Sequence, residues 1–447
     1  MKRIPEVFDC WLESGAMPYG QAHYPFDSRE IFDPEAGVGF PADFIAEGLD
    51  QTRGWFYSLL VLGVALFDRS PYRRTIVNGL VLAEDGQKMS KKLNNYPDPM
   101  EIVGKYGADA LRLYLLSSPA VRGEDVAFKE SEVALVGRRV IGRLRNVLSF
   151  YDLYAEKDVK EAEVLDISQK SVLDRWFMAR LNQASGEISD GFDNYLLDRV
   201  GRAIDDLVDD LSVWYLRRSR ERFKSDEDRV AASAVLRFGL KTTAKLIAPF
   251  APFVAEDIYL AVKADSDPES VHLTDWPVLA GEDKGVLDLM AEARELVSWG
   301  LEARSEAGVK VRQPLACLKV KEASEELKSD HSIQEVIKDE LNVKKLIFDP
   351  GISSSVVLDL ELTDELRREG DLRELVRSLQ SLRKTSNLKP GQTAKLRIFS
   401  LNDVGREWRD LLDQAAAETD LLVEWQPEKI EGWAVQWLDQ EFVVVLE

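Results

Sequence analysis

Lys88, Lys91 and Lys92 lie close together in the segment GQKMSKKLNNY, which spans positions 86–96. Lysine is a compact, mobile point charge, and lysines on a loop can neutralise the negative charge that develops on a polyphosphate during phosphoryl or nucleotidyl transfer. Gly86 precedes the lysines and permits sharp main-chain turns. The residues alone leave two interpretations open: a phosphate-binding loop, or a solvated loop of basic residues.

The elements around these lysines predict an α/β arrangement. TIVNGLVLA (75–83) is rich in β-branched residues and predicts a strand or a tight hairpin, followed by a turn at 84–86. Asp98-Pro99 is a helix start, and EIVGKYGADALRLYLLS continues that helix. The apolar segment TRGWFYSLLVLGVALF (52–67) predicts a buried helix.

Composition bounds the class of protein. The 447 residues carry a formal net charge of −21 and are 45% apolar, which indicates two to four globular domains. No apolar run approaches the roughly 20 residues of a membrane span, and no signal-peptide core follows Lys2 and Arg3, so we expect no membrane association. The only cysteines, Cys10 and Cys317, predict neither a disulfide framework nor a zinc site and favour the cytoplasm.

The acidic balance argues against nucleic-acid binding through overall charge, but screening still permits a local basic site. Such a site is indicated where four arginines, Arg217, Arg218, Arg220 and Arg222, follow an acidic stretch at 205–210. Two interpretations stay open: an ion-paired, solvated helix face, or a patch that contacts a nucleic-acid backbone.

Residues 131–284 predict a helical bundle, and residues 285–447 predict an α+β section. In the bundle, apolar residues recur every three to four positions, as in Val200, Ile204, Leu207, Leu211 and Trp214. In the last section, 295–320 aligns without gaps on 374–399, and both segments predict a helix, a short basic turn and a strand. Either the section contains an internal repeat, or two ordinary units share residues by chance.

Lys88-Met89-Ser90-Lys91-Lys92 resembles the KMSKS signature of class I aminoacyl-tRNA synthetases, with Lys92 replacing the final serine. Further segments are similar to the isoleucyl branch of that family: VFDCWLESG (7–15), EGLDQTRGWFYSLL (47–60), NGLVLAEDGQKMSKKLNNYPDP (78–99), WYLRRSRERF (214–223) and ESVHLTDWP (269–277). VFDCW and VKVRQPL resemble the form shared by archaeal, eukaryotic and some bacterial enzymes. The resemblance extends over nearly the whole chain.

The resemblance implies a fold and an activity. It implies the second half of a Rossmann-type catalytic domain (1–130), an α-helical anticodon-binding bundle (131–284) and a small α+β C-terminal extension (285–447). The implied reaction is the ATP-dependent ligation of isoleucine to tRNA(Ile). ATP with Mg²⁺ is then a substrate, isoleucine and tRNA(Ile) are partners, and no protein-bound metal is expected.

The resemblance also implies roles for residues. Lys88, Met89, Ser90, Lys91 and Lys92 would contact the ATP phosphates, with Lys91 as the principal contact. The residues that would line the aminoacyl-adenylate site are Glu47, Gly48, Asp50 and Gln51, whose carboxylate and amide groups can accept from ribose hydroxyls or an ammonium group.

Trp11 and Trp55 would enclose the isoleucine side chain, although packing in a core is the commoner role of tryptophan. Glu13 stands where the family commonly has Asp, and no role is assigned to it. Arg217 and Arg218 are the expected tRNA contacts.

The family's second signature, His-x-Gly-His, is not matched by His23, His272 or His331. The first half of the nucleotide-binding fold and the editing domain therefore have no counterpart in these residues. An incomplete gene, a gene split between two chains, and a degenerate copy each explain this. Two other functions stay open: a valyl or leucyl relative, and a non-catalytic tRNA-binding module derived from a synthetase.

Overall fold

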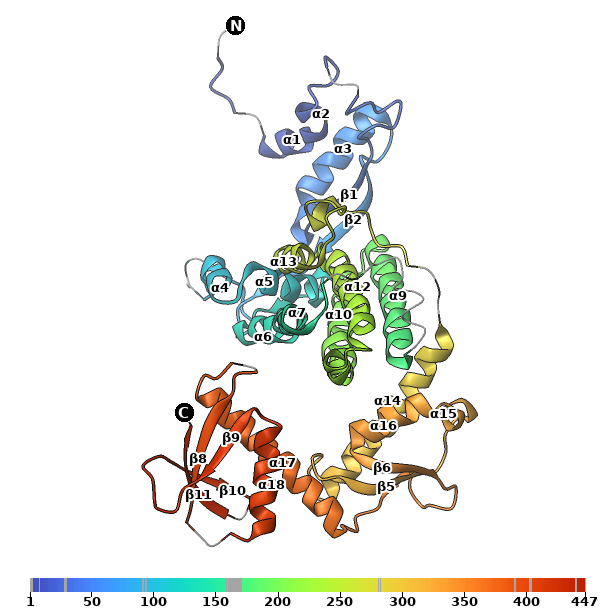
Figure 1. Cartoon of the computed structure of the whole chain (residues 1–447). Helices are drawn as coiled ribbons and strands as arrows, with labels where there is room; N and C mark the ends of the chain where they lie inside the picture. Colours follow the sequence, from blue (N-terminus) through green and yellow to red (C-terminus); the bar gives the residue numbers. More distant parts are fainter. Residues whose placement is uncertain are drawn as a thin grey trace. The chain divides into compact units, whose positions relative to one another are not determined.

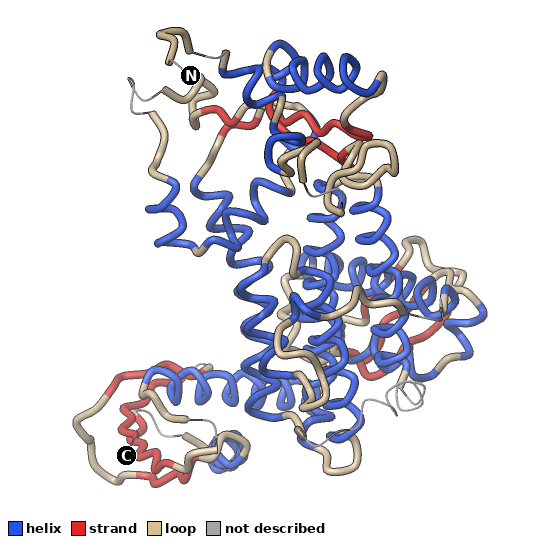
Figure 2. Tube along the Cα trace, turned by 90° about the horizontal axis from the view of Figure 1, so that it is seen from above, coloured by secondary structure: helices blue, strands red, loops and turns tan. Residues whose placement is uncertain are grey.

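The computed structural model describes residues 3–446 except 8, 28–29, 91, 93–94, 158, 160–170, 280, 282, 390, 402–403 and 439. The chain forms two compact units, Met1–Asp283 and Lys284–Glu447 (Figure 1). Figure 2 shows that the strands of the chain are shorter than most of its helices. Among the described residues, no helix is long and apolar enough to cross a membrane.

The first unit begins with an α/β part. Its elements, in chain order, are α1 (Cys10–Gly15), α2 (Met17–Gln21), β1 (Ala42–Gly48), η1 (Leu49–Arg53), α3 (Trp55–Phe67), β2 (Tyr72–Asn78), β3 (Val81–Leu82), α4 (Pro99–Tyr106), α5 (Ala108–Leu116), η2 (Pro119–Arg122) and β4 (Val126–Ala127). β1 and β2 are parallel, from Ala42 opposite Tyr72 to Gly48 opposite Asn78. β3 and β4 form a second parallel pair. The predicted α/β arrangement is confirmed at this level.

The predicted helix at 52–67 is confirmed as α3, but the expectation that it is buried is wrong. Phe56 and Leu59 are buried, whereas Tyr57 is 62% exposed and Val61 and Val64 are 45% and 47% exposed. The reason is that α3 packs against β1, β2 and α1 through its other residues, which leaves this face of the apolar helix uncovered.

The segment 75–83 is not a hairpin. It ends β2 at Asn78 and begins β3 at Val81, in two different sheets. Gly79 lies at the break, where a Cβ atom would come within 1.9 Å of the Glu124 carbonyl oxygen. The helix predicted after Pro99 begins as expected, because Asp98 accepts from the Met100 amide at 2.8 Å, but Gly107 (φ 88°) divides it into α4 and α5.

The rest of the first unit is the predicted helical section. Its elements are α6 (Glu130–Val136), η3 (Gly137–Gly142), α7 (Arg143–Tyr154), α9 (Val172–Asp193), α10 (Leu197–Asp209), η5 (Asp210–Leu216), α11 (Arg217–Ser219), η6 (Arg220–Lys224), α12 (Arg229–Ile247), α13 (Pro252–Val262) and η7 (Val271–Leu273). α9 packs against α10 and α12, and α12 against α13 (Figure 1). The periodic residues from Val200 to Trp214 are all buried. η3 and η5 are π-helical turns.

The second unit contains α14 (Lys284–Glu306), β5 (Leu315–Val320), α15 (Glu325–Ser329), α16 (His331–Leu341), β6 (Val343–Phe348), β7 (Val356–Leu358), α17 (Asp364–Thr385), β8 (Ala394–Ser400), α18 (Arg406–Ala417), β9 (Leu421–Trp425), β10 (Trp433–Trp437) and β11 (Gln440–Leu446). Its sheets have the strand orders β6-β5-β7 and β10-β11-β8-β9. In each sheet a central strand, β5 or β8, has a parallel neighbour on one side and an antiparallel neighbour on the other. The α+β character predicted for this section is what the unit shows.

A buried arginine closes the turn between α14 and β5. Arg304 is 1% exposed, and its Nη1 donates to the carbonyl oxygens of Lys310 and Gln313 at 3.1 and 3.0 Å. Its Nε and Nη2 donate to the carbonyl oxygens of Leu341 and Asn342 at 2.8 and 3.0 Å. One guanidinium thus joins the end of α14, the start of β5 and the start of β6. Burial lowers the pKa of Arg304 to about 10.

The same arrangement recurs between α17 and β8. Arg383 donates through Nη2 to the carbonyl oxygens of Lys389 and Gln392 at 3.0 and 2.7 Å, and through Nη1 to that of Asp420 at 3.4 Å. Arg383, Lys389 and Gln392 align with Arg304, Lys310 and Gln313. Asp420 directly precedes β9, as Asn342 directly precedes β6. The helix, turn and strand predicted for both segments are confirmed, and the shared bonding favours the repeat over chance.

Candidate functional site

The lysine loop leaves β3 through a tight turn. Ala83 donates its amide to the Gln87 carbonyl at 2.8 Å, Gly86 takes φ 78°, and Lys88 bridges back to Leu82. This turn places Lys88 opposite Leu82 at the end of β3, with its side chain exposed.

Beyond the turn, side chains fix the backbone of the loop. Asn95 Oδ1 accepts from the Ser90 amide at 2.9 Å, and Asn95 Nδ2 donates to the Lys88 carbonyl at 3.2 Å. Ser90 Oγ accepts from the Lys92 amide at 3.2 Å. Lys91 lies outside the described residues.

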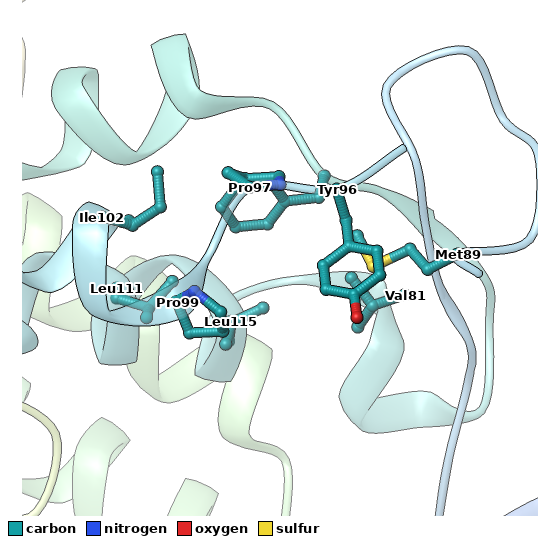
Figure 3. Close-up of a pocket in the computed structure, with 9 residues that line it drawn as sticks. Val81, Met89, Tyr96, Pro97, Pro99, Ile102, Leu111 and Leu115 are labelled. Carbon is teal, nitrogen blue, oxygen red and sulfur yellow. The ribbon is translucent and has the colours of Figure 1, made fainter. Parts of the chain in front are cut away.

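Met89 borders two cavities beside the loop. One, of about 160 Å³, is lined by Val81, Met89, Tyr96, Pro97, Pro99, Ile102, Leu111, Leu115 and Phe128. In Figure 3 the Met89 side chain points toward the Tyr96 ring. The other, of about 280 Å³, adds the polar residues Glu84, Asn95 and Glu130. Hydrogen bonds from Lys105 and Tyr106 lower the pKa of the Glu130 carboxyl, which keeps this wall anionic.

A second group of predicted residues lies at the carboxyl end of β1. Glu47 and Gly48 end the strand, and Asp50 and Gln51 lie in η1. Gln51 Oε1 accepts from the Trp55 amide at 2.9 Å, and Gln51 Nε2 donates to Asp50 Oδ2 at 3.2 Å. In open parallel sheets, ligands bind outside the carboxyl ends of the strands.

The two tryptophans join this second group. Trp55 Nε1 donates to the Ser14 carbonyl at 3.0 Å, which ties α3 to α1. The Trp11 ring lies against Gly54, where a Cβ atom would come within 3.0 Å of the ring and 2.8 Å of Gln51 Oε1. Trp11 is 44% exposed, which is unlike a core packing residue. Among the described residues, no hydrogen bond or ion pair connects this group with 88–95.

The arginines of the helical section do not share one face. Arg217 is exposed and donates from Nε to the Val213 carbonyl at 2.9 Å, while Arg218 is half-buried. Partial burial and the nearby Arg220 charge lower the pKa of Arg217. Arg222 instead turns inward, and its Nη1 and Nη2 donate to the fully buried Asp174 at 2.8 and 2.7 Å.

The acidic stretch before these arginines pairs with other helices. Its ion pairs are Arg139–Asp205 at 2.6 Å, Arg143–Asp209 at 2.7 Å and Arg180–Asp210 at 2.8 Å. These pairs pin η3, α7 and α9 to the segment 205–210. These ion pairs connect different helices. They therefore differ from the ion-paired face of a single helix, which was one of the two interpretations of the sequence.

Two family models match this chain. The family model "tRNA synthetases class I (I, L, M and V)" matches residues 1–128, and "Anticodon-binding domain of tRNA ligase" matches residues 174–322. The chain belongs to the class I aminoacyl-tRNA synthetases. The family model that matches residues 1–128 covers four amino-acid specificities, I, L, M and V.

Three similar curated proteins are isoleucine–tRNA ligases. The isoleucine–tRNA ligase of Chlamydia caviae is 46% identical over 354 residues, which are 78% of this chain and 34% of that protein. Those of Chlamydia abortus and Chlamydia muridarum are both 47% identical over 77% of this chain and 34% of their own lengths. The chain thus spans about a third of the length of these relatives. A solved ternary complex of an Agrobacterium radiobacter LeuRS with tRNA and LeuAMS matches 64% of this chain and 34% of that chain, at 20% identity and a TM-score of 0.48.

The structure adds residues that sequence analysis missed. Asn95 and Ser14 contact the two predicted groups, Asn95 through its side-chain amide and Ser14 through its carbonyl. A side-chain amide such as that of Asn95 carries both a donor and an acceptor, but its residue type alone does not indicate which backbone groups it contacts. No metal-binding group of three or more His, Cys, Asp or Glu occurs in the described part of the chain.

Proposed function

We propose that this synthetase chain supplies the KMSKK half of an isoleucine-activating site together with a tRNA-binding helical domain. The observation that carries the proposal is the identity of 46–47% to proteins named isoleucine–tRNA ligase. The reaction forms an aminoacyl-adenylate from isoleucine and ATP with release of pyrophosphate, and then transfers the aminoacyl group to tRNA. Mg²⁺ enters with ATP as part of the substrate.

The loop supports a phosphate-binding role. Lys88 and Lys92 are exposed, and their backbones are fixed through Asn95 and Ser90. Exposed ammonium groups on a braced backbone can stabilise charge on the leaving pyrophosphate. Lys91 is proposed as the principal phosphate contact from its match to the family signature, as are Met89 and Ser90 for the rest of the motif.

The group at β1 supports an adenylate site. Glu47 and Asp50 offer carboxylates at the strand end, where a ribose or an ammonium group can be held. Gly48 permits the approach of Asp50, because a Cβ atom there would lie 2.8 Å from Asp50 Oδ1. Gln51 caps α3, and Trp11 and Trp55 provide rigid apolar surfaces suited to isoleucine.

The sheet and α3 indicate that more protein packs here. A two-stranded sheet is marginally stable by itself, and an exposed apolar helix face is typical of an interface. Tyr57, Leu60, Val61 and Val64 form such a face on α3. We propose that it packs against the half of the catalytic domain that carries His-x-Gly-His, in a longer polypeptide or in a separate chain. The free thiols of Cys10 and Cys317 are consistent with the cytoplasm.

Isoleucine-dependent ATP–pyrophosphate exchange tests the proposal. The 447-residue chain alone should show no measurable exchange, because loss of even one transition-state donor costs about 100- to 1,000-fold in rate. Adding the His-x-Gly-His half, in trans or fused, should restore exchange with isoleucine in preference to valine and leucine.

The outcomes separate the alternatives. Robust exchange by the chain alone would contradict the need for a second half. Preference for valine or leucine would assign the chain to a neighbouring specificity, and tRNA binding without exchange in any combination would favour a non-catalytic module.

A further inference from the structure

We propose that Asn95 is a positioning residue that sets the backbone of the KMSKK loop for the ATP phosphates. The proposal rests on the proposed function, since it concerns how that loop presents its lysines. Asn95 lies outside the five signature positions, and its side chain reaches back to two of them.

The first step is the pair of hydrogen bonds that one amide makes. Oδ1 accepts from the Ser90 amide at 2.9 Å while Nδ2 donates to the Lys88 carbonyl at 3.2 Å. Only a side chain with both an acceptor and a donor at its tip can satisfy these two groups together. An aspartate or a leucine at this position would leave at least one backbone group without its partner, so the requirement for asparagine is chemical and not merely steric.

The second step is the connection to the next lysine. Ser90, held by Asn95 through its amide, accepts from the Lys92 amide through Oγ at 3.2 Å. Asn95 therefore orders the backbone at Lys88 directly and at Lys92 through Ser90. Both lysine side chains remain exposed. The hydrogen bonds therefore fix the backbone at each lysine and do not involve the ammonium groups.

The third step is the apolar support under this arrangement. Met89 lies between the two clamped positions, and its side chain points to Tyr96, the neighbour of Asn95 (Figure 3). The packing of Met89 and the hydrogen bonds of the Asn95 side-chain amide therefore hold the same short stretch of backbone. Preorganised charge needs no rearrangement when the transition state forms, which is where such positioning affects rate.

Amide hydrogen exchange on the 447-residue chain tests the hydrogen bonds. In Asn95→Ala, the Ser90 amide should exchange about 5-fold faster or more, the ratio that corresponds to a lost hydrogen bond of about 1 kcal/mol. The Ala83 amide, which donates to the Gln87 carbonyl in the adjacent turn, is the internal control and should not change. An unchanged Ser90 amide would overturn the proposal.

Exchange kinetics on the chain complemented with the His-x-Gly-His half test the role. Asn95→Ala should lower kcat for isoleucine-dependent exchange about 10-fold or more, with KM for ATP within about 2-fold. Asn182→Ala is the matched control, because Asn182 also donates to a carbonyl, that of Gly281, at 2.9 Å in the helical section.

Unchanged kcat in Asn95→Ala, or a rise in KM alone, would overturn the positioning role. If the complemented wild type shows no exchange, the proposed function fails, while the hydrogen-exchange result still decides whether Asn95 holds the loop.

Discussion

At the scale of single residues, burial decides which charged groups in the chain are structural. Asp174 is fully buried and accepts from Tyr215 Oη at 2.8 Å as well as from both Nη atoms of Arg222. Burial alone would lower the pKa of Arg222, but the bonds to Asp174 raise it. A buried carboxylate with three donors joins α9, η5 and η6, so Arg222 stabilises the bundle instead of contacting a ligand.

Tyr215 should make the bundle less stable as pH rises into the alkaline range. Burial, followed by the Asp174 charge, raises the pKa of Tyr215 well above its usual value near 10. The folded state therefore retains a proton that the unfolded chain releases, and this stabilisation is complete below about pH 10 and declines as pH rises further.

Tyr215→Phe should lower the free energy of unfolding by about 1–2 kcal/mol at pH 8, and the difference from wild type should shrink by pH 11. Urea unfolding across this range measures it. A difference that stays constant with pH would contradict the assignment.

At the scale of elements, part of the fold follows from sequence and part depends on contacts that sequence does not display. The bundle helices follow from periodic apolar residues such as Ile204 and Leu207. The inward turn of Arg222 does not, because the π-helical turn η5 shifts the helix register between α10 and the arginines. The division of 75–83 at Gly79 depends on the Glu124 carbonyl, which comes from a distant segment.

Part of the candidate site likewise follows from sequence, and part depends on contacts that the sequence does not display. The lysines and tryptophans are recognisable from local residue patterns, and the structure gathers Trp11, Gln51 and Trp55 at one strand end. The contribution of Asn95 could not be predicted from pattern alone, because it depends on a loop folding back over several residues. The roles of the individual site residues stay predictions.

Each buried arginine of the repeat should stabilise the strand that follows its turn. Replacing Arg304 or Arg383 by Met keeps much of the volume but removes every donor, leaving several carbonyls without these partners. Each change should lower the local opening free energy of β5 or β8 by about 3 kcal/mol, measured by native-state hydrogen exchange.

Arg377→Met is the control on the same helix. Arg377 is 58% exposed and pairs with Glu374, so its loss should cost under about 1 kcal/mol. If Arg383→Met behaves like this control, the guanidinium does not hold the turn.

At the scale of the whole molecule, a net charge of −21 must coexist with the proposed binding of tRNA. Long-range repulsion is screened beyond about 10 Å at moderate salt, so local basic groups decide binding. The segment matched by the anticodon-binding model includes Arg217 and Arg218. We propose Arg217 and Arg218, which follow η5, as the contact with tRNA.

Replacing Arg217 and Arg218 by Ala should weaken tRNA binding about 10-fold and reduce the slope of log K against log salt by about 1–2, because fewer counterions are released. Binding titrations at several salt concentrations measure both quantities. Lys328→Ala, which removes an exposed cation paired with Glu325 outside the matched segment, should change neither. Equal slopes for the double variant and wild type would assign these arginines a structural role.

The buried arginines also bear on how the two turns can diverge. Each guanidinium binds main-chain carbonyl oxygens, which every amino acid carries, and not the side chains of the turn. The sequences of the turns can therefore differ, as VKVRQ and LKPGQ do, while the arginine contacts persist. Mutations that abolish the arginine should be purged, whereas the turn residues are free to acquire new contacts, as Arg312 has with Glu374 at 2.9 Å. An interior contact shared by both copies thus leaves the surface of each copy open to evolutionary change.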